Sequence, residues 1–152
     1  MLNWDNLFRR YVWHETKTPY FTPVRRLSSE QAEHELFVYA LLLSVLFLVI
    51  ALVSLAGRLP HGGAAIVPIY AFTALCAAVI LGFTRHPWAA FYCASGPLAA
   101  LAYFAAFGFH PNLEFGDKVV LVLLALGWLA YSRRVVAITL AYADLPAAAP
   151  PG

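Results

Sequence analysis

Four apolar stretches fill most of this chain, at residues 36–57, 64–83, 88–109 and 119–143, and the first three contain no charged side chain. A helix needs roughly 20 consecutive apolar residues to cross the hydrocarbon core of a bilayer. A helix of similar length in a soluble protein would carry polar residues at helical spacing along its exposed face. The sequence therefore predicts an all-α integral membrane protein, an up-and-down bundle of four transmembrane helices.

The composition agrees with a membrane protein and limits the number of domains. Hydrophobic residues make up 62% of the chain and charged residues 12%, whereas about a quarter of the residues in an ordinary soluble domain are charged. We predict an interfacial arm at residues 1–27, a four-helix transmembrane domain at 28–145 and a disordered tail at 146–152. This division leaves no room for a second folded domain.

The distribution of lysine and arginine predicts the orientation of the bundle. Four spans place one set of basic residues on the side of the termini: Arg9, Arg10, Lys17, Arg25, Arg26, Arg85, Arg133 and Arg134. Only Arg58 and Lys118 fall on the other side, which makes eight against two. Because cytoplasmic segments beside the spans retain an excess of basic residues, we expect both termini in the cytoplasm. The alanine- and leucine-rich style and the compact loops suggest a bacterial inner membrane.

The first long helix is expected to begin before the membrane, at residue 28. Ser28 followed by Gln31 has the spacing of a capping box, in which each side chain bonds to the other residue's backbone. Two helical turns would then project from the bilayer with four ionisable residues, Glu30, Glu33, His34 and Glu35. We interpret these residues as a solvated polar collar, with a Glu30–His34 surface pair as the alternative.

The arm before residue 28 combines aromatic and basic residues. Over residues 2–12 its apolar side chains recur three or four positions apart, at Trp4, Leu7, Phe8 and Tyr11, which indicates a short amphipathic helix in the membrane interface. Residues 16–26 contain two prolines and are expected to be extended and irregular. Neither piece can bury its apolar groups alone, so we predict that the arm docks on a partner protein through Trp4, Phe8, Trp13, Tyr20 and Phe21. Lipid or the bundle itself are the alternative surfaces.

Small residues mark where helices of this chain are expected to pack closely. They recur every three or four positions in the second span, at Ala71, Ala74, Ala78 and Gly82, and in the third span, at Ala89, Cys93, Gly96 and Ala100. Such spacings let helix backbones approach one another in lipid, where packing drives association. They predict helix–helix seams without indicating any particular oligomer.

Pro97 lies near the middle of the third span and predicts a helix kink. Proline removes one backbone hydrogen bond and leaves an upstream carbonyl without its usual donor. A functional interpretation would use that carbonyl in a solute or cofactor site, with Tyr92, Ser95, Thr73 and Cys76 as neighbours. A packed kink, satisfied by Ser95 or by an adjacent helix, is the favoured interpretation.

The fourth span is interrupted by Arg133 and Arg134. Two arginines at the centre of a bilayer would be costly, but near the cytoplasmic surface both can extend to lipid phosphates. We therefore expect a tilted helix that leaves the membrane core near Arg133 and continues along the interface. The predicted lipid-headgroup residues are Arg25, Arg26, Arg85, Arg133 and Arg134, and a specific anionic-lipid or quinone headgroup site is the alternative to ordinary topology determination.

The sequence contains no recognisable catalytic, metal-binding or cofactor-binding motif. The five histidines lie near the membrane faces without metal-site spacing, and a bis-histidine haem at one face is a minor alternative. The sequence contains no nucleophile elbow, phosphate loop or zinc-protease pattern. We therefore predict no catalytic residue, no metal and no cofactor, and the net charge of +2 gives no indication of nucleic-acid binding.

Two classes of function survive this elimination. The first is a non-catalytic accessory or assembly subunit of a larger membrane complex, which contacts lipid and protein partners and docks through its arm. The alternative is a small-solute or lipid-handling channel or transporter that acts as a homo-oligomer. The second class would normally require an ionisable residue within the membrane, and only the arginine pair of the fourth span comes close.

Overall fold

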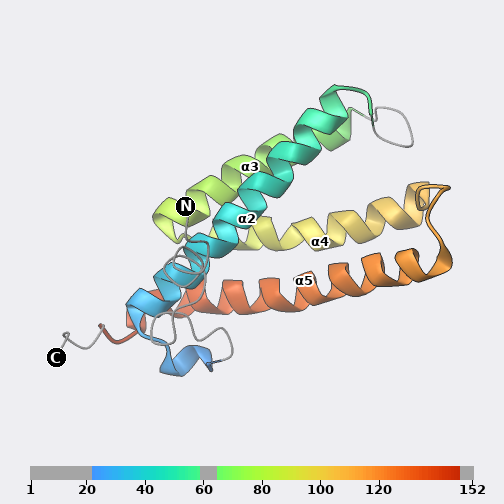
Figure 1. The fold of residues 1–152 in the computed structure, drawn as a ribbon. Coiled ribbons are helices and arrows are strands. Elements are labelled where there is room, and N and C mark those ends of the chain that lie inside the picture. Colours follow the sequence, from blue (N-terminus) through green and yellow to red (C-terminus); the bar gives the residue numbers. More distant parts are fainter. Residues whose placement is uncertain (1–21, 59–64, 148–152) are drawn as a thin grey trace, which may run out of the picture.

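The described part of the chain folds into four long helices that are connected by short segments. The computed structural model describes residues 22–58 and 65–147, and Figure 1 shows their arrangement. The elements, labelled as in that figure, are η1 (Val24–Arg26), α2 (Ser29–Leu55), α3 (Ile66–Thr84), α4 (Pro87–Phe107), α5 (Phe115–Ala141) and η2 (Tyr142–Asp144). All four α-helices are long and apolar enough to cross a membrane. The predicted all-α transmembrane four-helix fold is confirmed.

Local sequence signals account for where the helices begin. The Oγ of Ser28 accepts a hydrogen bond from the Gln31 amide at 3.3 Å, and the Gln31 side chain accepts one from the Ser28 amide at 3.0 Å. This confirms the predicted capping box, and the helix starts one residue later, at Ser29. Pro87 occupies the first position of α4, where its missing amide costs little. At the start of α5, Asp117 accepts a hydrogen bond from the Glu114 amide at 3.1 Å.

The four helices form two antiparallel hairpins that meet at one end (Figure 1). Helix α2 packs along α3, and α4 packs along α5, whereas contacts between α2 and α5 are few. The hairpins converge where η1, the Thr84–Pro87 turn and the end of α5 lie, and they diverge toward the α2–α3 and α4–α5 connections (Figure 1). The end where they converge is called the joined end below.

Small residues line the contact between α2 and α3, as predicted. Ala71, Ala74 and Ala78 are buried. A Cβ atom added to Gly82 would lie 3.2 Å from the Cβ of Ala40 on α2. The close approach of these two helices therefore depends on side chains no larger than alanine along one face of α3.

The seam on α4 lies between the two hairpins. Ala89, Cys93 and Gly96 are buried, whereas Ala100 is partly exposed. A Cβ atom on Gly96 would lie 2.8 Å from the Trp128 ring of α5 and 3.1 Å from the Phe47 ring of α2. Gly96 is thus the point where three helices come together.

The segment before α2 differs in one detail from its prediction. We expected residues 16–26 to be extended and irregular, but Val24–Arg26 forms a single 3-10 turn in which the Arg26 amide donates to the Pro23 carbonyl at 2.8 Å. Pro23 itself is extended and serves as the N-cap of this turn. Proline before the first helical position is compatible with a turn of this kind. The prediction of an irregular segment was therefore wrong for Val24–Arg26.

Replacing Gly96 with alanine is expected to destabilise the bundle by about 1–3 kcal/mol, the usual cost of overpacking. The added methyl group would push against the Trp128 ring, whose Nε1 donates a hydrogen bond to the Tyr39 hydroxyl at 3.2 Å. The ring can yield only by weakening that bond. Thermal unfolding in detergent, followed by circular dichroism, measures the change.

Gly127→Ala is the matched control for this substitution. Gly127 lies on α5, one residue before Trp128, and an added Cβ would meet no atom within 4 Å. Alanine favours a helix over glycine, so Gly127→Ala should leave stability unchanged or raise it slightly. Equal melting temperatures for the Gly96→Ala variant and the native chain would show that the seam is wrongly placed.

Candidate functional site

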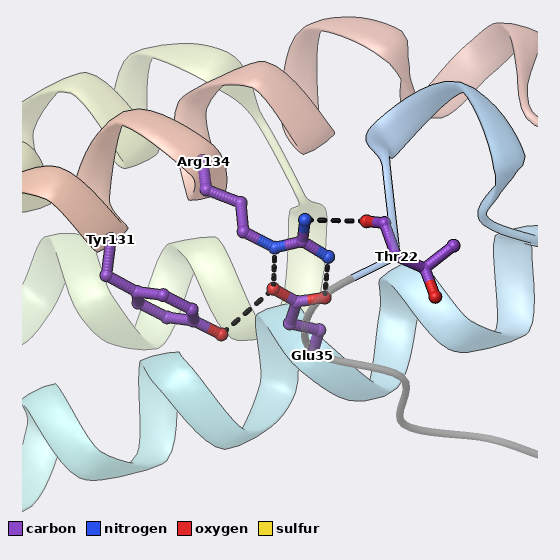
Figure 2. Close-up of polar contacts among 4 residues, drawn as sticks. All are labelled: Thr22, Glu35, Tyr131 and Arg134. Carbon is purple, nitrogen blue, oxygen red and sulfur yellow. Dashed lines mark hydrogen bonds and ion pairs between the residues drawn. The ribbon is translucent and has the colours of Figure 1, made fainter. Parts of the chain in front are cut away.

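A buried ion pair joins α2 to α5 at the joined end of the bundle (Figure 2). Glu35 lies in the second turn of α2, and its side chain is only 2% exposed. The Nε of Arg134 donates to Glu35 Oε1 at 2.6 Å, and its Nη2 donates to Oε2 at 2.9 Å. This two-point geometry matches the planar guanidinium to the planar carboxylate, the strongest form of such a pair.

Two further groups complete the hydrogen bonding of this pair. The hydroxyl of Tyr131, one turn before Arg134 on α5, donates to Glu35 Oε1 at 2.9 Å. The remaining terminal nitrogen of Arg134, Nη1, donates to the backbone carbonyl of Thr22 at 2.7 Å. Figure 2 shows the side chains of Glu35, Tyr131 and Arg134 directed toward one another and the backbone carbonyl of Thr22 directed toward the guanidinium. Every nitrogen of the guanidinium, whose side chain is 19% exposed, therefore has a protein acceptor.

The contact with Thr22 ties the base of the arm to the bundle. Leu27, between η1 and α2, is fully buried, and Val24 packs against the core. The Ser29 amide donates to the Pro146 carbonyl at 2.9 Å, which links the start of α2 to the segment after η2. The described part of the arm, from residue 22 onward, therefore lies against this bundle, one of the three surfaces considered from the sequence.

A second layer of polar contacts lies one turn farther along α2 from Glu35. The Tyr39 hydroxyl and Ser132 Oγ are 2.9 Å apart, and Ser132 Oγ donates to the Trp128 carbonyl at 2.8 Å. Because the serine proton is used on that carbonyl, the Tyr39 hydroxyl donates to Ser132 and accepts from Trp128 Nε1. Each of these polar groups is satisfied inside the protein, so the layer closes the space between α2 and α5 beside the ion pair.

Arg85 forms a second, more exposed ion pair at the same end. It lies in the turn between α3 and α4 and contacts the carboxylate of Glu33 on α2, with the two side chains 28% and 48% exposed. Its guanidinium also lies over the Tyr142 ring, 5.8 Å from the centroid. An exposed pair contributes little to stability, so Arg85 is a weaker connection than Arg134.

A separate polar cluster joins α3 to α4 near Pro97. Ser95 Oγ donates to the Tyr92 carbonyl at 2.6 Å and lies 2.7 Å from the Tyr70 hydroxyl, while Thr73 Oγ1 lies 2.7 Å from the Tyr92 hydroxyl. Of the four neighbours proposed for a site at Pro97, Tyr92, Ser95 and Thr73 thus lie in one hydrogen-bonded cluster, which also includes Tyr70. The fourth, Cys76, is exposed and takes no part in these bonds. The hydroxyls satisfy one another, as expected of packing between helices.

The predicted site residues fall into distinct groups. Pro97 is buried within α4, which is helical on both sides of it, and the kink itself stays a prediction. Arg85 and Arg134 pair with carboxylates of α2, whereas Arg25, Arg26 and Arg133 are exposed. The arm anchors lie outside the described residues: Trp4, Phe8, Trp13, Tyr20 and Phe21.

The role of Glu35 was not anticipated from the sequence. We assigned it to a solvated collar because it stands among polar residues just before an apolar run. Two features of the sequence fit the pairing, although neither identifies the partner. An arginine within the apolar sequence of α5 needs a counter-charge, and Glu35 is the acidic residue nearest to the apolar run of α2 on the same side of the membrane.

The described polar contacts join helices of the bundle to one another and to the base of the arm. Within residues 22–58 and 65–147, no group of three or more histidine, cysteine or acidic side chains is placed to hold a metal ion. Comparison of the chain with protein-family models, with curated proteins and with solved structures finds no match. Interpretation of the site therefore rests on its geometry.

Removing Arg134 should destabilise the bundle by about 3 kcal/mol, because it leaves the Glu35 carboxylate buried without its partner, and removing Glu35 should cost less, because the Arg134 side chain is 19% exposed. We expect Glu35→Ala and Arg134→Ala to unfold at clearly lower temperature or denaturant concentration. The double variant Glu35→Leu with Arg134→Leu should recover part of the loss, since apolar replacements remove both charges together. A double-mutant cycle in detergent measures the coupling.

The Glu33–Arg85 pair supplies the internal control. Glu33→Ala removes a carboxylate that is half exposed, and its cost should stay below about 1 kcal/mol. Additive effects in the Glu35–Arg134 cycle, with no coupling between the two sites, would contradict the proposed strength of the buried pair.

Proposed function

We propose that this chain is a non-catalytic accessory or assembly subunit of a larger membrane complex, and that it docks on its partners through the N-terminal arm. The observation that carries the proposal is the 2.7 Å hydrogen bond from Arg134 to the Thr22 carbonyl. It connects Thr22, the first described residue of the arm, to the two-point ion pair between α2 and α5 at the joined end.

Fixing the base of the arm makes docking more effective. A flexible attachment would spread the arm over many directions, and binding would have to overcome that loss of freedom. Here the buried Leu27, the 3-10 turn of η1 and the Thr22 contact set where residue 22 stands relative to the helices. The bundle thereby acts as a membrane scaffold that presents the arm at one face.

The internal polar groups support a scaffold in a second way. Glu35, Tyr39 and Tyr70 each hydrogen-bond to another helix of the same chain. Such bonds hold helices together in lipid, where apolar contact with a neighbouring helix is no better than contact with lipid tails. Polar side chains committed to packing in this way favour a structural role over a transport pathway.

The orientation forms part of the proposal. With both termini in the cytoplasm of a bacterial inner membrane, the joined end and the base of the arm lie on the cytoplasmic face. A partner would then meet the arm there. This orientation agrees with the excess of basic residues on that side.

Labelling of single cysteines tests the orientation. In a chain carrying Cys76→Ala and Cys93→Ala, we expect Asp144→Cys to react with a membrane-impermeant maleimide only from the cytoplasmic side. Asn112→Cys, between α4 and α5, should react only from the other side. Both positions are exposed, so access depends on the membrane alone. The reverse pattern would overturn the orientation.

Deleting residues 2–21 tests the docking function. The deletion spares Thr22, Leu27 and the contacts of η1, so the truncated protein should insert normally and melt within a few degrees of the intact chain. It should fail to co-purify with the complex from native membranes in mild detergent. Mass spectrometry of the co-migrating proteins provides the readout.

Arg134→Gln is the companion variant for this experiment. It keeps every residue of the arm but removes the charged contact with Glu35 and weakens that with Thr22, so partner recovery should fall without disappearing. Retention of every partner by the deletion variant, with loss of lipid association only, would contradict the proposed docking. A homogeneous homo-oligomer without other proteins would favour the channel or transporter alternative.

A further inference from the structure

We propose that Arg25, Arg26 and Arg133 bind the phosphate-bearing headgroup of an anionic phospholipid at the joined end of the bundle. This binding site goes beyond the docking function, because it uses η1 and the exposed face of α5 and requires no partner protein. Its ligand class is a phospholipid with net negative charge, such as phosphatidylglycerol or cardiolipin.

The structure separates the arginines of the joined end into two kinds. Arg134 and Arg85 are neutralised by Glu35 and Glu33 of α2. Arg25, Arg26 and Arg133 are exposed, and among residues 22–58 and 65–147 none of the three meets a carboxylate. Three cationic side chains thus remain available to an external anion.

The fold holds these three residues at one end of the molecule. Arg25 and Arg26 form the last two positions of η1, which packs against α5. The bond from Arg134 to the Thr22 carbonyl fixes the segment before η1 on α5, and Arg133 is the residue adjacent to that anchor. The buried Leu27 fixes the segment after η1. The three unpaired arginines therefore lie on elements, η1 and α5, whose positions are fixed relative to one another.

The surroundings of Arg133 point to lipid as the source of the anion. Leu126, seven residues before it on α5, is 46% exposed, and Leu140, seven residues after it, is 59% exposed. These positions place apolar surface about 10 Å away on either side along the helix. The Arg133 side chain can extend so that its unpaired guanidinium meets the phosphate of a lipid. The acyl chains of the same lipid then cover the exposed leucines on either side.

Retention of individual lipids by the purified protein tests this site. The intact chain and an Arg25→Gln, Arg26→Gln, Arg133→Gln variant are each placed in micelles with equal amounts of phosphatidylglycerol and phosphatidylcholine, and bound lipid is counted by native mass spectrometry. We expect the intact chain to retain phosphatidylglycerol. The triple variant should bind it about a hundredfold more weakly, as follows from about fivefold for each arginine near an anionic surface.

Arg58→Gln serves as the matched control. Arg58 is an exposed arginine beyond the end of α2, on the side opposite the joined end, and its replacement should leave retention of phosphatidylglycerol unchanged. The replaced arginines have no described protein partner, so the triple variant should also melt as the intact chain does. An equal loss of phosphatidylglycerol in the Arg58→Gln variant would overturn the site in favour of a general effect of charge.

Inorganic phosphate distinguishes the two sources of the same anion. Millimolar phosphate should fail to displace phosphatidylglycerol, because the free ion lacks acyl chains to cover the leucines beside Arg133. Complete displacement by phosphate would assign the arginines to a soluble anion and contradict the lipid site. Equal retention of phosphatidylcholine and phosphatidylglycerol by the intact chain would also overturn it.

Discussion

The pairing of Glu35 with Arg134 is the contact on which the rest of the joined end depends. It crosses from the first hairpin to the second, between helices that otherwise meet at few points. Removal of a carboxylate from water is costly, and only a complete set of hydrogen bonds offsets that cost. Tyr131 and the Thr22 carbonyl complete that set. The position of the arm is thereby coupled to the packing of α2 against α5.

Contacts between the hairpins change in character along the bundle axis. At the joined end they are ionic, one turn farther they are the hydroxyl and indole bonds of Tyr39, and at Gly96 they become tight apolar packing around Trp128. Each kind of contact suits its surroundings, since charges are tolerated near the headgroups and close packing is the main attraction within the hydrocarbon. Toward the α2–α3 and α4–α5 connections the hairpins diverge (Figure 1).

The sequence predicted the fold more fully than the site, for physical reasons. Spans follow from long apolar runs, and the start of α2 follows from Ser28 and Gln31, because both signals are local in the chain. The small-residue faces of α3 and α4 were also visible, although which helix would cover each face was not. Glu35 and Arg134 are 99 positions apart, and no periodicity connects them. Only the docking of one hairpin on the other reveals that a residue assigned to a solvated collar is buried.

That separation along the chain has a consequence for synthesis in the membrane. When α2 and α3 emerge from the ribosome as the first hairpin, Arg134 has not yet been made, and the Glu35 carboxylate must remain solvated at the membrane surface. Burial of that carboxylate becomes favourable only when α5 arrives with its guanidinium. Formation of the pair therefore depends on completion of α5. A chain interrupted before α5 would keep this acidic group beside a membrane helix without the guanidinium that neutralises it in the complete bundle.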